Sequence, residues 1–490
     1  MFDEEIVRKE RLELLRQRGI DPYPSVSSRT HTVTEVLAQF SSLQESHQLV
    51  TVVGRIRLIR KHGGLTFLQL QDDSGVMQVA LKRDEVGEET YKMFGETIDI
   101  GDFLQIDGTV FVTKKGEQTI LVRTYTLLTK VLFPLPEKWH GLTDTETRFR
   151  KRYLDLIMNQ DVKNRMRTRS KIVTAIRALL DQKGFIEVET PTLQPVYGGG
   201  FARPFTTHHN ALDADFYLRI SDEMYLKRLL VGGFEKVYEI TKVFRNEGID
   251  HDHNPEFTMF EAQIAYENYE YGMNIFEEIF EYAALNALGT TTVQHGDVFI
   301  ELKRPWKRMR LIDAVKEIGQ LSEDAWKSID TAKQALRQKL SPSKQEELNK
   351  LQTAGEVLAF AFEELVEEKL IQPTIIYDYP VEVSPLAKKS KDPRFVERFE
   401  AFALGSEIGN NYSELNDPLD LEARFIEEKR KEEAGFDEAH QTDLDYLEAI
   451  KHGMPPACGL GIGIDRMIML LTGANNIKEV ILFPTLRPQK

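Results

Sequence analysis

The pattern of apolar and polar residues changes character along this 490-residue chain. Residues 2–19 place apolar side chains at helical spacing, including Leu12 and Leu15, and the helix is expected to stop at Gly19. Residues 49–129 instead contain five β-rich runs separated by the turn signals HGG, DDSG and KKGE. Five short strands in about 80 residues predict a small closed or partly closed barrel, such as an OB-fold.

After this barrel region, helical and strand patterns mix. Ile172, Ile176 and Leu180 fall on one stripe of a helix that Gly184 can end. The run FIEVETP then alternates as a strand and stops at Pro191. These patterns predict a mixed α and β domain.

The later part of the chain adds a helical insertion and further strands. A mostly charged helical stretch at 310–371 indicates the insertion, and strands are expected at 374–384 and 396–415. A strand–helix unit, GLGIGIDRMIMLLTG, follows them. The proline-containing linker VLFPLPEKWHG predicts a boundary between two domains, residues 1–137 and 138–490.

Composition narrows the class of protein. The single cysteine, Cys458, excludes an intrachain disulfide framework and a multi-cysteine zinc site, and it fits a reducing cytoplasm. The opening MFDEEIVRKERLELL mixes acids with bases and has no apolar core of a signal peptide. No apolar run approaches the ~20 residues of a membrane span. A cytoplasmic protein of enzyme size is expected.

Charge is distributed unevenly along the chain, whose net charge is −15. Residues 1–150 hold 20 Lys and Arg against 22 Asp and Glu, whereas the remaining 340 residues hold 43 against 56. An acidic field repels phosphates, so any contact with nucleic acid must use local basic patches.

The stretch GLGIGID (459–465) suggests a nucleotide-binding turn. Its glycines run G-x-G-x-G, which does not match the dinucleotide fingerprint, and the alternative is glycine that permits tight backbone packing. Arg466 follows at the start of the expected helix. A guanidinium there can stack on a planar base or bind phosphate.

The stretch RNEGIDHDHNPEF suggests a metal site. In an extended segment His251 and His253 would share one face, and two imidazoles with acids could hold zinc. Pro255 follows at once and no third ligand has matching spacing, which favours a solvated loop. Arg245 and Glu247, two apart on the preceding strand, would share a face, either as a structural ion pair or with the arginine facing phosphate.

The stretch RFEAFALGSEIGNNYSEL carries a third candidate. Gly405 could reverse the chain and bring Glu400 and Glu407 together as a site for a hard cation. Beyond them, the strand period of two places on one face Asn410, Tyr412 and Glu414. Their Cα span of about 13 Å could let converging side chains grip both ends of a long amino acid. The alternative is an exposed acidic hairpin.

Taken together, these stretches resemble the class II aminoacyl-tRNA synthetases, and within subclass IIb the bacterial-type lysyl-tRNA synthetases. Residues 148–156 resemble the start of the family's catalytic domain, and its motifs 1, 2 and 3 are matched by residues 184–193, 244–257 and 459–473. The likeness to the lysine enzymes rests on DEMYLKRLLVGGFEKVYEI, EIGNNYSELNDP and NNIKEVILFP. The match covers nearly the full chain.

The resemblance implies an α+β fold and an activity. The fold is an N-terminal helix and OB-fold anticodon-binding barrel, followed by a catalytic domain of antiparallel β-sheet flanked by helices with the helical insertion. The activity is ATP-dependent activation of L-lysine to lysyl-adenylate and transfer to the 3′ end of tRNA(Lys), with Mg²⁺ as cofactor and a homodimer formed through motif 1. The lysine carboxylate is already ionised at pH 7, so alignment and charge neutralisation, without a general base, would carry the first step.

The resemblance also implies the residues that bind ATP. Arg245 would bind the α-phosphate and the lysine carboxylate, and Glu247 would lie near the adenine amine. Phe257 would stack under adenine with Arg466 above it, and His253 would reach the outer phosphates. The catalytic set is Arg245, Glu247 and Arg466. The other ATP-binding positions, with Mg²⁺ on the two glutamates, are Glu400, Glu407, Gly463 and Asp465.

The implied amino-acid site consists of Gly199, Glu223, Glu261, Gln263, Asn410 and Glu414. Gly199 and Glu223 would hold the α-ammonium and Asn410 the carboxylate. Glu414 would pair with the ε-ammonium, so that charge selects against neutral side chains.

In the barrel, the resemblance implies contacts to the uridine-rich anticodon. Phe67 would stack on an anticodon base, and Arg60, Gln78 and Glu117 match positions that hydrogen-bond the bases. From the pattern LTFLQLQD, Phe67 could equally be a barrel-core residue.

Two positions depart from the family pattern. Asp252 stands where arginine or threonine is usual, and its carboxylate would repel a triphosphate unless it points away or meets metal. Gln263 stands where a tyrosine usually helps to hold the ε-ammonium. The glutamine carbonyl can accept a hydrogen bond from an ammonium group, but its shorter reach could alter size discrimination. Lysine is the expected substrate, with ornithine or a lysine isomer left open.

Three other functions compete with this interpretation. A ligase that attaches lysine or a lysine analogue to a protein generally lacks the N-terminal barrel, so residues 49–129 oppose it. In an aspartyl- or asparaginyl-type enzyme, Glu414 would repel the substrate carboxylate. A catalytically inactive relative that binds RNA usually loses motif residues, and those singled out above are all present.

Overall fold

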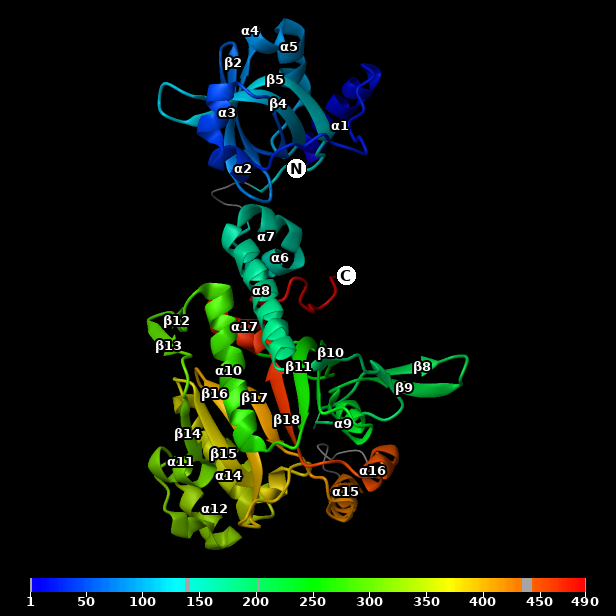
Figure 1. Cartoon of the computed structure of the whole chain (residues 1–490), viewed down its shortest axis with the longest axis vertical. Coiled ribbons are helices and arrows are strands. Elements are labelled where there is room, and N and C mark those ends of the chain that lie inside the picture. Colours follow the sequence, from blue (N-terminus) through cyan, green and yellow to red (C-terminus); the bar gives the residue numbers. More distant parts are fainter. Residues whose placement is uncertain (1, 137–141, 201, 434–442, 490) are drawn as a thin grey trace. The chain divides into compact units, whose positions relative to one another are not determined.

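The computed structural model describes residues 2–136, 142–200, 202–433 and 443–489. The chain divides into two compact units, residues 1–143 and residues 144–490, which Figure 1 traces from blue to red. Among the described helices, none combines the length and apolar composition that crossing a membrane requires.

The first unit contains the expected barrel. The sheet closes in the order β1 (Val50–His62), β2 (Leu65–Gln71), β3 (Val76–Lys82), β5 (Gln118–Thr129) and β4 (Phe103–Val112). Alternate residues of these strands, such as Leu68 and Leu70 of β2, fill the interior. Around the barrel lie α1 (Phe2–Gln17), α2 (Val33–Ala38), α3 (Phe40–Ser46), α4 (Arg83–Val86) and α5 (Glu88–Thr97). The prediction of an OB-type barrel is confirmed.

The second unit is built on one large sheet. Its strand order is β14 (Lys307–Arg310), β15 (Thr374–Pro380), β16 (Phe395–Ala403), β17 (Ser406–Ser413), β18 (Ala457–Gly463), β11 (Glu256–Ala265), β10 (Lys236–Phe244) and β6 (Ile186–Glu187). Neighbouring strands from β15 to β10 are antiparallel, and among the described strands of this sheet only the outer pairs β14–β15 and β10–β6 are parallel. The central position of β18 brings two segments some 200 residues apart in sequence, β11 and β18, into register.

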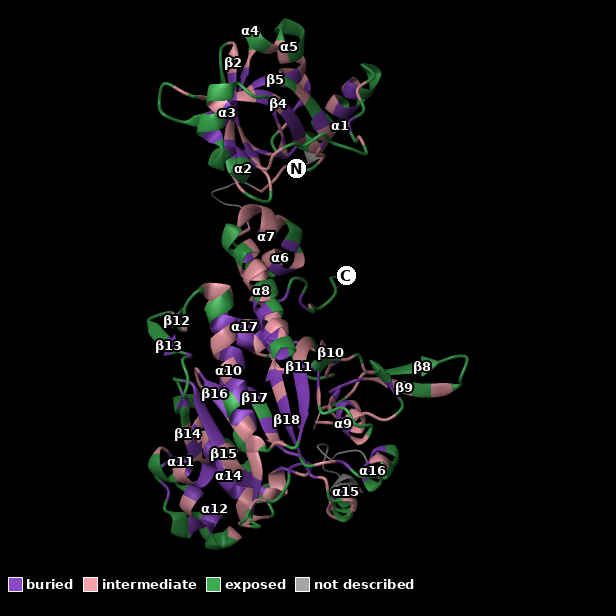
Figure 2. Cartoon of the chain, in the orientation of Figure 1, coloured by how far each residue is buried: buried purple, intermediate pink, exposed green. Residues whose placement is uncertain are grey.

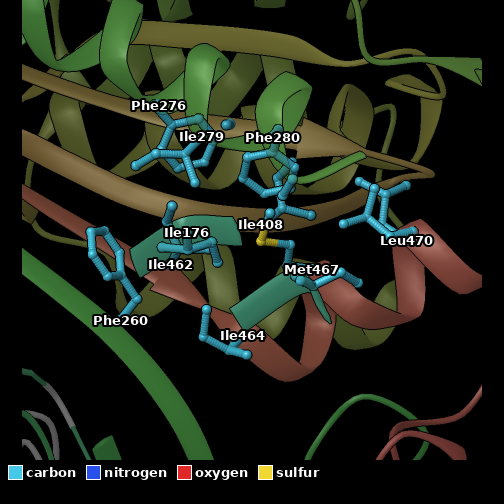
Figure 3. Packing of buried hydrophobic residues seen from close by; sticks show 14 of the residues in the cluster. Ile176, Phe260, Phe276, Ile279, Phe280, Ile408, Ile462, Ile464, Met467 and Leu470 are labelled. Atoms are coloured by element: carbon cyan, nitrogen blue, oxygen red, sulfur yellow. The ribbon is translucent and has the colours of Figure 1, made fainter. Parts of the chain in front are cut away.

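Helices cover one face of this sheet and create the main core. The covering helices are α8 (Gln160–Gln182), α10 (Tyr269–Leu288) and α17 (Ile464–Thr472). Figure 3 shows Phe276 and Phe280 of α10 and Met467 of α17 packed with Phe260 and Ile462 of the sheet, and Figure 2 shows the strands as the most buried part of the unit. The predicted stripe of α8 is confirmed, because its apolar residues are fully buried in this cluster.

The insertion consists of helices that pack against strands β14, β15 and β16 in a second hydrophobic core. They are α11 (Leu311–Glu317), α12 (Ile329–Arg337), α13 (Pro342–Lys350) and α14 (Ala354–Leu365), with short 3₁₀ turns at Glu323–Lys327 and Glu367–Lys369. The remaining elements near the sheet are α6 (Thr145–Arg150), α7 (Arg152–Met158), β7 (Leu193–Gln194), β8 (Thr206–His209), β9 (Ala214–Leu218), α9 (Glu223–Val231), β12 (Thr292–His295), β13 (Val298–Glu301), α15 (Pro418–Glu433) and α16 (Leu444–Lys451).

Candidate active site

A cavity of about 450 Å³ lies on the face of the sheet opposite the main core. The strand period of two divides β11 between the two faces: Phe260 and Ala262 enter the core, whereas Glu261 and Gln263 line the cavity. In β18, Leu460 and Ile462 belong to the core. The alternating residues Gly459, Gly461 and Gly463 line the cavity. The G-x-G-x-G spacing therefore belongs to a strand whose glycines all lie on the cavity side, where they leave room because they have no side chains.

The cavity gathers nearly all the catalytic-domain residues that the family resemblance implies. Its lining includes Gly199, Glu223, Arg245, Glu247, His253, Phe257, Glu261, Gln263, Glu407, Asn410, Glu414, Gly463, Asp465 and Arg466. Glu400 is the one implied residue that does not line it. Residues from five sequence-distant segments thus surround one volume.

Arg245 is the first residue of the loop that follows β10. Its N–H donates to the carbonyl of Pro255 at 2.8 Å, and its guanidinium lies 5.2 Å from the centre of the Phe257 ring. Its Nε is buried with no acceptor among the residues that the structure describes. Burial lowers the pKa of Arg245, against the opposite effect of the nearby carboxylates of Glu247 and Glu261. This cation is available to an anion in the cavity.

The prediction that Arg245 and Glu247 share one face of a strand is wrong. Strand β10 ends at Phe244. Arg245 still donates to the Pro255 carbonyl in register, but Pro255 has no N–H to return, so the ladder stops there and Glu247 lies in the loop. Glu247 is exposed at the cavity rim and is not held in a buried ion pair with Arg245.

The DHDH stretch forms a tight turn instead of an extended segment. The carboxylate of Asp250 accepts the backbone N–H groups of Asp252 and His253, each at 2.8 Å, and lies 2.9 Å from His253 Nδ1. Arg466 donates to His253 Nε2 at 3.1 Å, so Nδ1 carries the proton that is donated to Asp250. His251 instead lies 2.9 Å from the amide nitrogen of Asn476.

The expectation that the two histidines share a face is therefore wrong. The Asp250 cap turns the backbone, so the two rings reach different partners. Within the described ranges, no group of three or more His, Cys, Asp or Glu side chains is arranged to hold a metal ion.

Glu400 and Glu407 lie on the hairpin of β16 and β17. The hairpin reverses at Leu404 and Gly405, whose φ angles are 57° and 74°; glycine adopts such an angle readily, whereas leucine rarely does. The Glu400 carboxylate accepts from Arg398 and, at 2.7 Å, from the hydroxyl of Tyr379. Burial and, next, the negative charge of Glu400 raise the pKa of Glu407, so the two carboxylates repel each other. Paired carboxylate oxygens suit Mg²⁺, which needs further oxygens from water or phosphate.

Arg398 and Tyr379 are functional candidates that the sequence patterns did not single out. Arg398 also donates to Asn410 Oδ1 at 3.0 Å, so it links the Glu400 carboxylate to the expected carboxylate-binding residue. The signal was present in the sequence, because Arg398 and Glu400 are two apart on one strand and share a face.

The amino-acid end of the cavity is closely packed. Gly199 has a φ of +83°, and a Cβ built there would lie 2.6 Å from Ser221 Oγ, which excludes a side chain. Ser221 donates to Glu261 Oε1 at 2.8 Å. Burial, followed by the charge of Glu223, raises the pKa of Glu261 to about 7. The three predicted residues of β17 and its end, Asn410, Tyr412 and Glu414, all face this volume.

Asp465 lies at the start of α17, where its carboxylate is buried. It accepts the backbone N–H of Thr258 at 2.7 Å and the guanidinium of Arg169 at 2.5 Å. These bonds join α17 to β11 and α8. The adjacent Arg466 donates to the carbonyl of Glu407 at 2.9 Å, so Asp465 braces the helix that presents Arg466 to the cavity.

In the barrel, Phe67 alternates with the buried Thr66 and Leu68 and lies outside the interior cluster. The barrel-core alternative for Phe67 is therefore wrong. Arg60 is its register partner on β1 and is exposed. The remaining predicted positions are Gln78 on β3, which donates to Thr119 Oγ1 at 2.9 Å, and the exposed Glu117.

Comparisons with known proteins agree with this architecture. The family described as tRNA synthetases class II (D, K and N) matches residues 144–487, and an OB-fold nucleic acid binding domain matches residues 50–128. The lysine–tRNA ligase of Pelotomaculum thermopropionicum is 50% identical, covering 99% of this chain and 95% of that protein. Those of Enterococcus faecalis and Bacillus subtilis are 48% and 47% identical, covering 99% and 98% of this chain and 97% and 96% of their own lengths. With fold, motifs and relatives in agreement over almost its whole length, the chain belongs to the class II aminoacyl-tRNA synthetases, in the family of the lysine–tRNA ligases.

Proposed function

We propose that the chain activates L-lysine with ATP and transfers the lysyl group to the 3′ end of tRNA(Lys). The observation that carries this proposal is the distribution of charge around the cavity: Arg245 lies beside Phe257 and Arg466 beside His253, whereas the buried carboxylate of Glu414 lies beside Gln263. An α-amino acid with a distal ammonium group and a nucleotide triphosphate would together match both ends.

In the first step, a lysine carboxylate oxygen attacks the α-phosphorus, and the bond from that phosphorus to pyrophosphate breaks. Arg245 would draw the carboxylate and the α-phosphate together and neutralise charge in the transition state. Its unpaired Nε and its place beside Phe257 support this role. In the second step, a hydroxyl of the terminal ribose attacks the lysyl carbonyl and AMP leaves.

The nucleotide would be held by groups from three elements. Adenine would stack between Phe257 of β11 and Arg466 of α17, with Glu247 at the rim near the exocyclic amine. His253 would give up its contact with Arg466 to meet the outer phosphates. Glu400 and Glu407 would hold Mg²⁺, whose positive charge would be shared with phosphate oxygens.

The amino acid would be held at both ends of its chain. Its α-ammonium would bind near Gly199, Glu223 and Glu261, and Asn410 would bind its carboxylate. Its distal ammonium would bind Glu414 and Gln263, which are both buried at the far end. Ornithine and lysine isomers remain the competing substrates, because Gln263 sets the reach of this end.

The barrel would bind the anticodon through Phe67, Arg60, Gln78 and Glu117. The barrel argues against the alternative function, a ligase that attaches lysine to a protein. The OB-fold domain matches residues 50–128, and the relative from Pelotomaculum thermopropionicum is similar along almost its full length, this barrel included. Stacking of a base on Phe67, together with hydrogen bonds to base edges from neighbouring side chains, suits recognition of a single-stranded loop. Charging of tRNA for translation would place the chain in the cytoplasm.

A homodimer through motif 1 belongs to the same proposal. Strand β6 of that motif lies at the outer edge of the large sheet, with Ile186 49% exposed. A short sheet edge with an exposed apolar residue is suited to pairing with a second copy.

Amino-acid-dependent exchange of pyrophosphate into ATP tests the central proposal. We expect exchange with lysine and weaker exchange with ornithine across a panel of cationic amino acids. Exchange with none of them would overturn the proposed activity. Exchange with ornithine but not lysine would overturn only the choice of substrate.

A further inference from the structure

A buried lysine of the protein itself lies behind the carboxylates that line the amino-acid end of the cavity. Lys227 of α9 is 1% exposed, and its Nζ lies 2.5 Å from Glu414 Oε2. The same Nζ contacts Glu223 Oε1, one helical turn earlier on α9. The ring centre of Tyr412 lies 5.2 Å from this Nζ, and the Tyr412 hydroxyl donates to Glu223 at 2.5 Å.

Lys227 is an ammonium ion in this setting. Burial lowers its pKa, but Glu223 and Glu414 together outweigh burial, and the pKa lies well above the ordinary lysine value. A buried cation between two carboxylates bridges them, so neither can move without breaking an ion pair in a medium of low polarity. Glu223 and Glu414 are the residues proposed for the two opposite ends of the amino acid.

The second oxygen of Glu414 determines the orientation of Gln263. Gln263 Nε2 donates to Glu414 Oε1 at 2.8 Å, because a carboxylate accepts only from the NH₂ side of an amide. Gln263 Oε1 therefore points elsewhere, and it is buried with no donor within the part of the chain that the structure covers. An unpaired buried oxygen is costly unless a ligand supplies a donor.

The facing strand leaves room for that donor. Gly459 of β18 pairs in register with Gln263 of β11. A Cβ at Gly459 would collide with Glu414 Oε1 and would lie 2.8 Å from Gln263 Nε2. The glycine therefore keeps the end of the cavity open beside both groups.

We propose that Lys227 is a positioning residue that sets the length of the diamino acid that the site accepts. Its single ammonium ties Glu223, at the α-ammonium end, to Glu414, at the distal end, and so fixes the separation of the two carboxylates. The distal ammonium of the substrate then binds beside Glu414, with Gln263 Oε1 as the second acceptor. This inference rests on the proposed amino-acid activation and adds to it a residue that touches no substrate atom.

The charges of the cluster add discrimination against neutral side chains. Lys227 offsets only one of the two negative charges of Glu223 and Glu414. A neutral amino acid of similar shape would leave that carboxylate charge and the Gln263 Oε1 atom buried without a hydrogen-bond donor. Its binding would therefore be weaker than that of a diamino acid. A longer or shorter diamino acid would satisfy one end of the site but not both.

The test is the variant Lys227→Met, assayed by pyrophosphate exchange with lysine and with ornithine. We expect KM for lysine to rise about tenfold and the lysine-to-ornithine ratio of kcat/KM to fall about tenfold, with KM for ATP unchanged. A purely structural role would lower activity toward both amino acids equally.

A double-mutant cycle with Glu414→Gln separates the effect on lysine binding from the cost of leaving the Glu414 carboxylate buried without its ammonium partner. If Lys227 acts through Glu414, adding Lys227→Met to Glu414→Gln should change KM for lysine by less than about twofold. The same substitution in the wild-type background should show the full effect.

The matched control is Lys130→Met in the barrel. Lys130 is equally buried and bridges two carboxylates, with Asp99 at 2.5 Å and Asp102 at 2.8 Å. It should lower the melting temperature and leave the lysine-to-ornithine ratio of exchange unchanged.

An unchanged ratio in folded Lys227→Met, or an equally large effect of that change in the Glu414→Gln background, would overturn the inference. Either result would leave the proposed function standing. Absence of exchange by the wild-type protein with every amino acid would instead overturn the proposed function.

Discussion

The two ends of the cavity bind charge in opposite ways. At the phosphate end, Arg245 has a buried Nε without an acceptor among the described residues, whereas Arg466 donates to the Glu407 carbonyl and to His253 and lies 3.5 Å from the Glu407 carboxylate. At the amino-acid end, Glu414 is already paired with Lys227 and Gln263. The phosphate end offers the guanidinium of Arg245 to an anion, whereas the amino-acid end holds carboxylates whose charge is partly balanced.

The difference follows from burial. Glu414 and Lys227 are each 1% exposed, and an isolated charge at such a depth would be unstable in the empty site. Glu247, Asp252 and His253 lie at the more open phosphate end, where water can solvate charge until ATP arrives. We infer that the phosphate end provides rate and that the amino-acid end provides selectivity.

The largest effect is expected from Arg245→Gln. The variant should lose about 10²- to 10³-fold in the rate of pyrophosphate exchange, because a group that neutralises the transition state is removed. Arg304→Gln is the matched control, since Arg304 pairs with Glu281 at the surface far from the cavity lining. A loss confined to KM for lysine would contradict the assignment of Arg245 to the phosphate end.

Glu414→Gln should change KM for lysine and not the maximal rate of exchange. KM for lysine should rise about 100-fold while KM for ATP stays within about twofold, because one charge-assisted contact to the distal ammonium is lost. Steady-state exchange at varied lysine and at varied ATP measures both. An unchanged KM for lysine would show that Glu414 does not meet the distal ammonium and would remove the contrast between the two ends.

The features that depend on strand alternation could be predicted from the sequence. The barrel, the reversal at Gly405 and the common face of Asn410, Tyr412 and Glu414 all follow from a period of two with glycine at a turn. The resemblance to the synthetase family, stated from the motifs, is confirmed by the family match and by the relatives.

Features that depend on contacts distant in sequence could not be predicted. Strand β10 ends at Phe244 because the residue facing Arg245 is Pro255, which has no N–H to donate, and nothing in KVYEITKVFRNE signals that pairing. Lys227 follows Glu223 by four residues, which predicts their ion pair, but Glu414 lies 187 residues later. Only the folded sheet and α9 bring that partner to Lys227.

Substitution of Phe67 extends the comparison to the barrel. Phe67→Ala should raise KM for tRNA about tenfold in the charging reaction, since base stacking on an aromatic ring is worth about 1–3 kcal/mol. Pyrophosphate exchange should not change, because that assay contains no tRNA. Phe67→Tyr keeps a ring and should restore charging. An equal loss of exchange in Phe67→Ala would indicate a folding defect instead.

The smallest effect concerns the pH dependence at Glu261, which burial, then Glu223, gives a pKa of about 7 in the folded protein. The unfolded chain loses this proton near the ordinary glutamate pKa of about 4.3, so stability falls as the pH rises from there through 7. Glu261→Gln should therefore melt at a higher temperature than the wild type at about pH 8 and show little difference at about pH 4.

The functional consequence has the opposite sign. Ionised Glu261 attracts the α-ammonium, so KM for lysine in the wild type should fall a few-fold as the pH rises through about 7. Burial raises the pKa of Glu414 to about 7 as well, so Glu261→Gln should lose part of that dependence and bind lysine more weakly at the higher pH. Melting temperature and KM for lysine, measured on both proteins across this range, separate the two effects. A variant that melted lower at the higher pH would show that Glu261 stabilises the amino-acid end instead of holding it ready for an ammonium group.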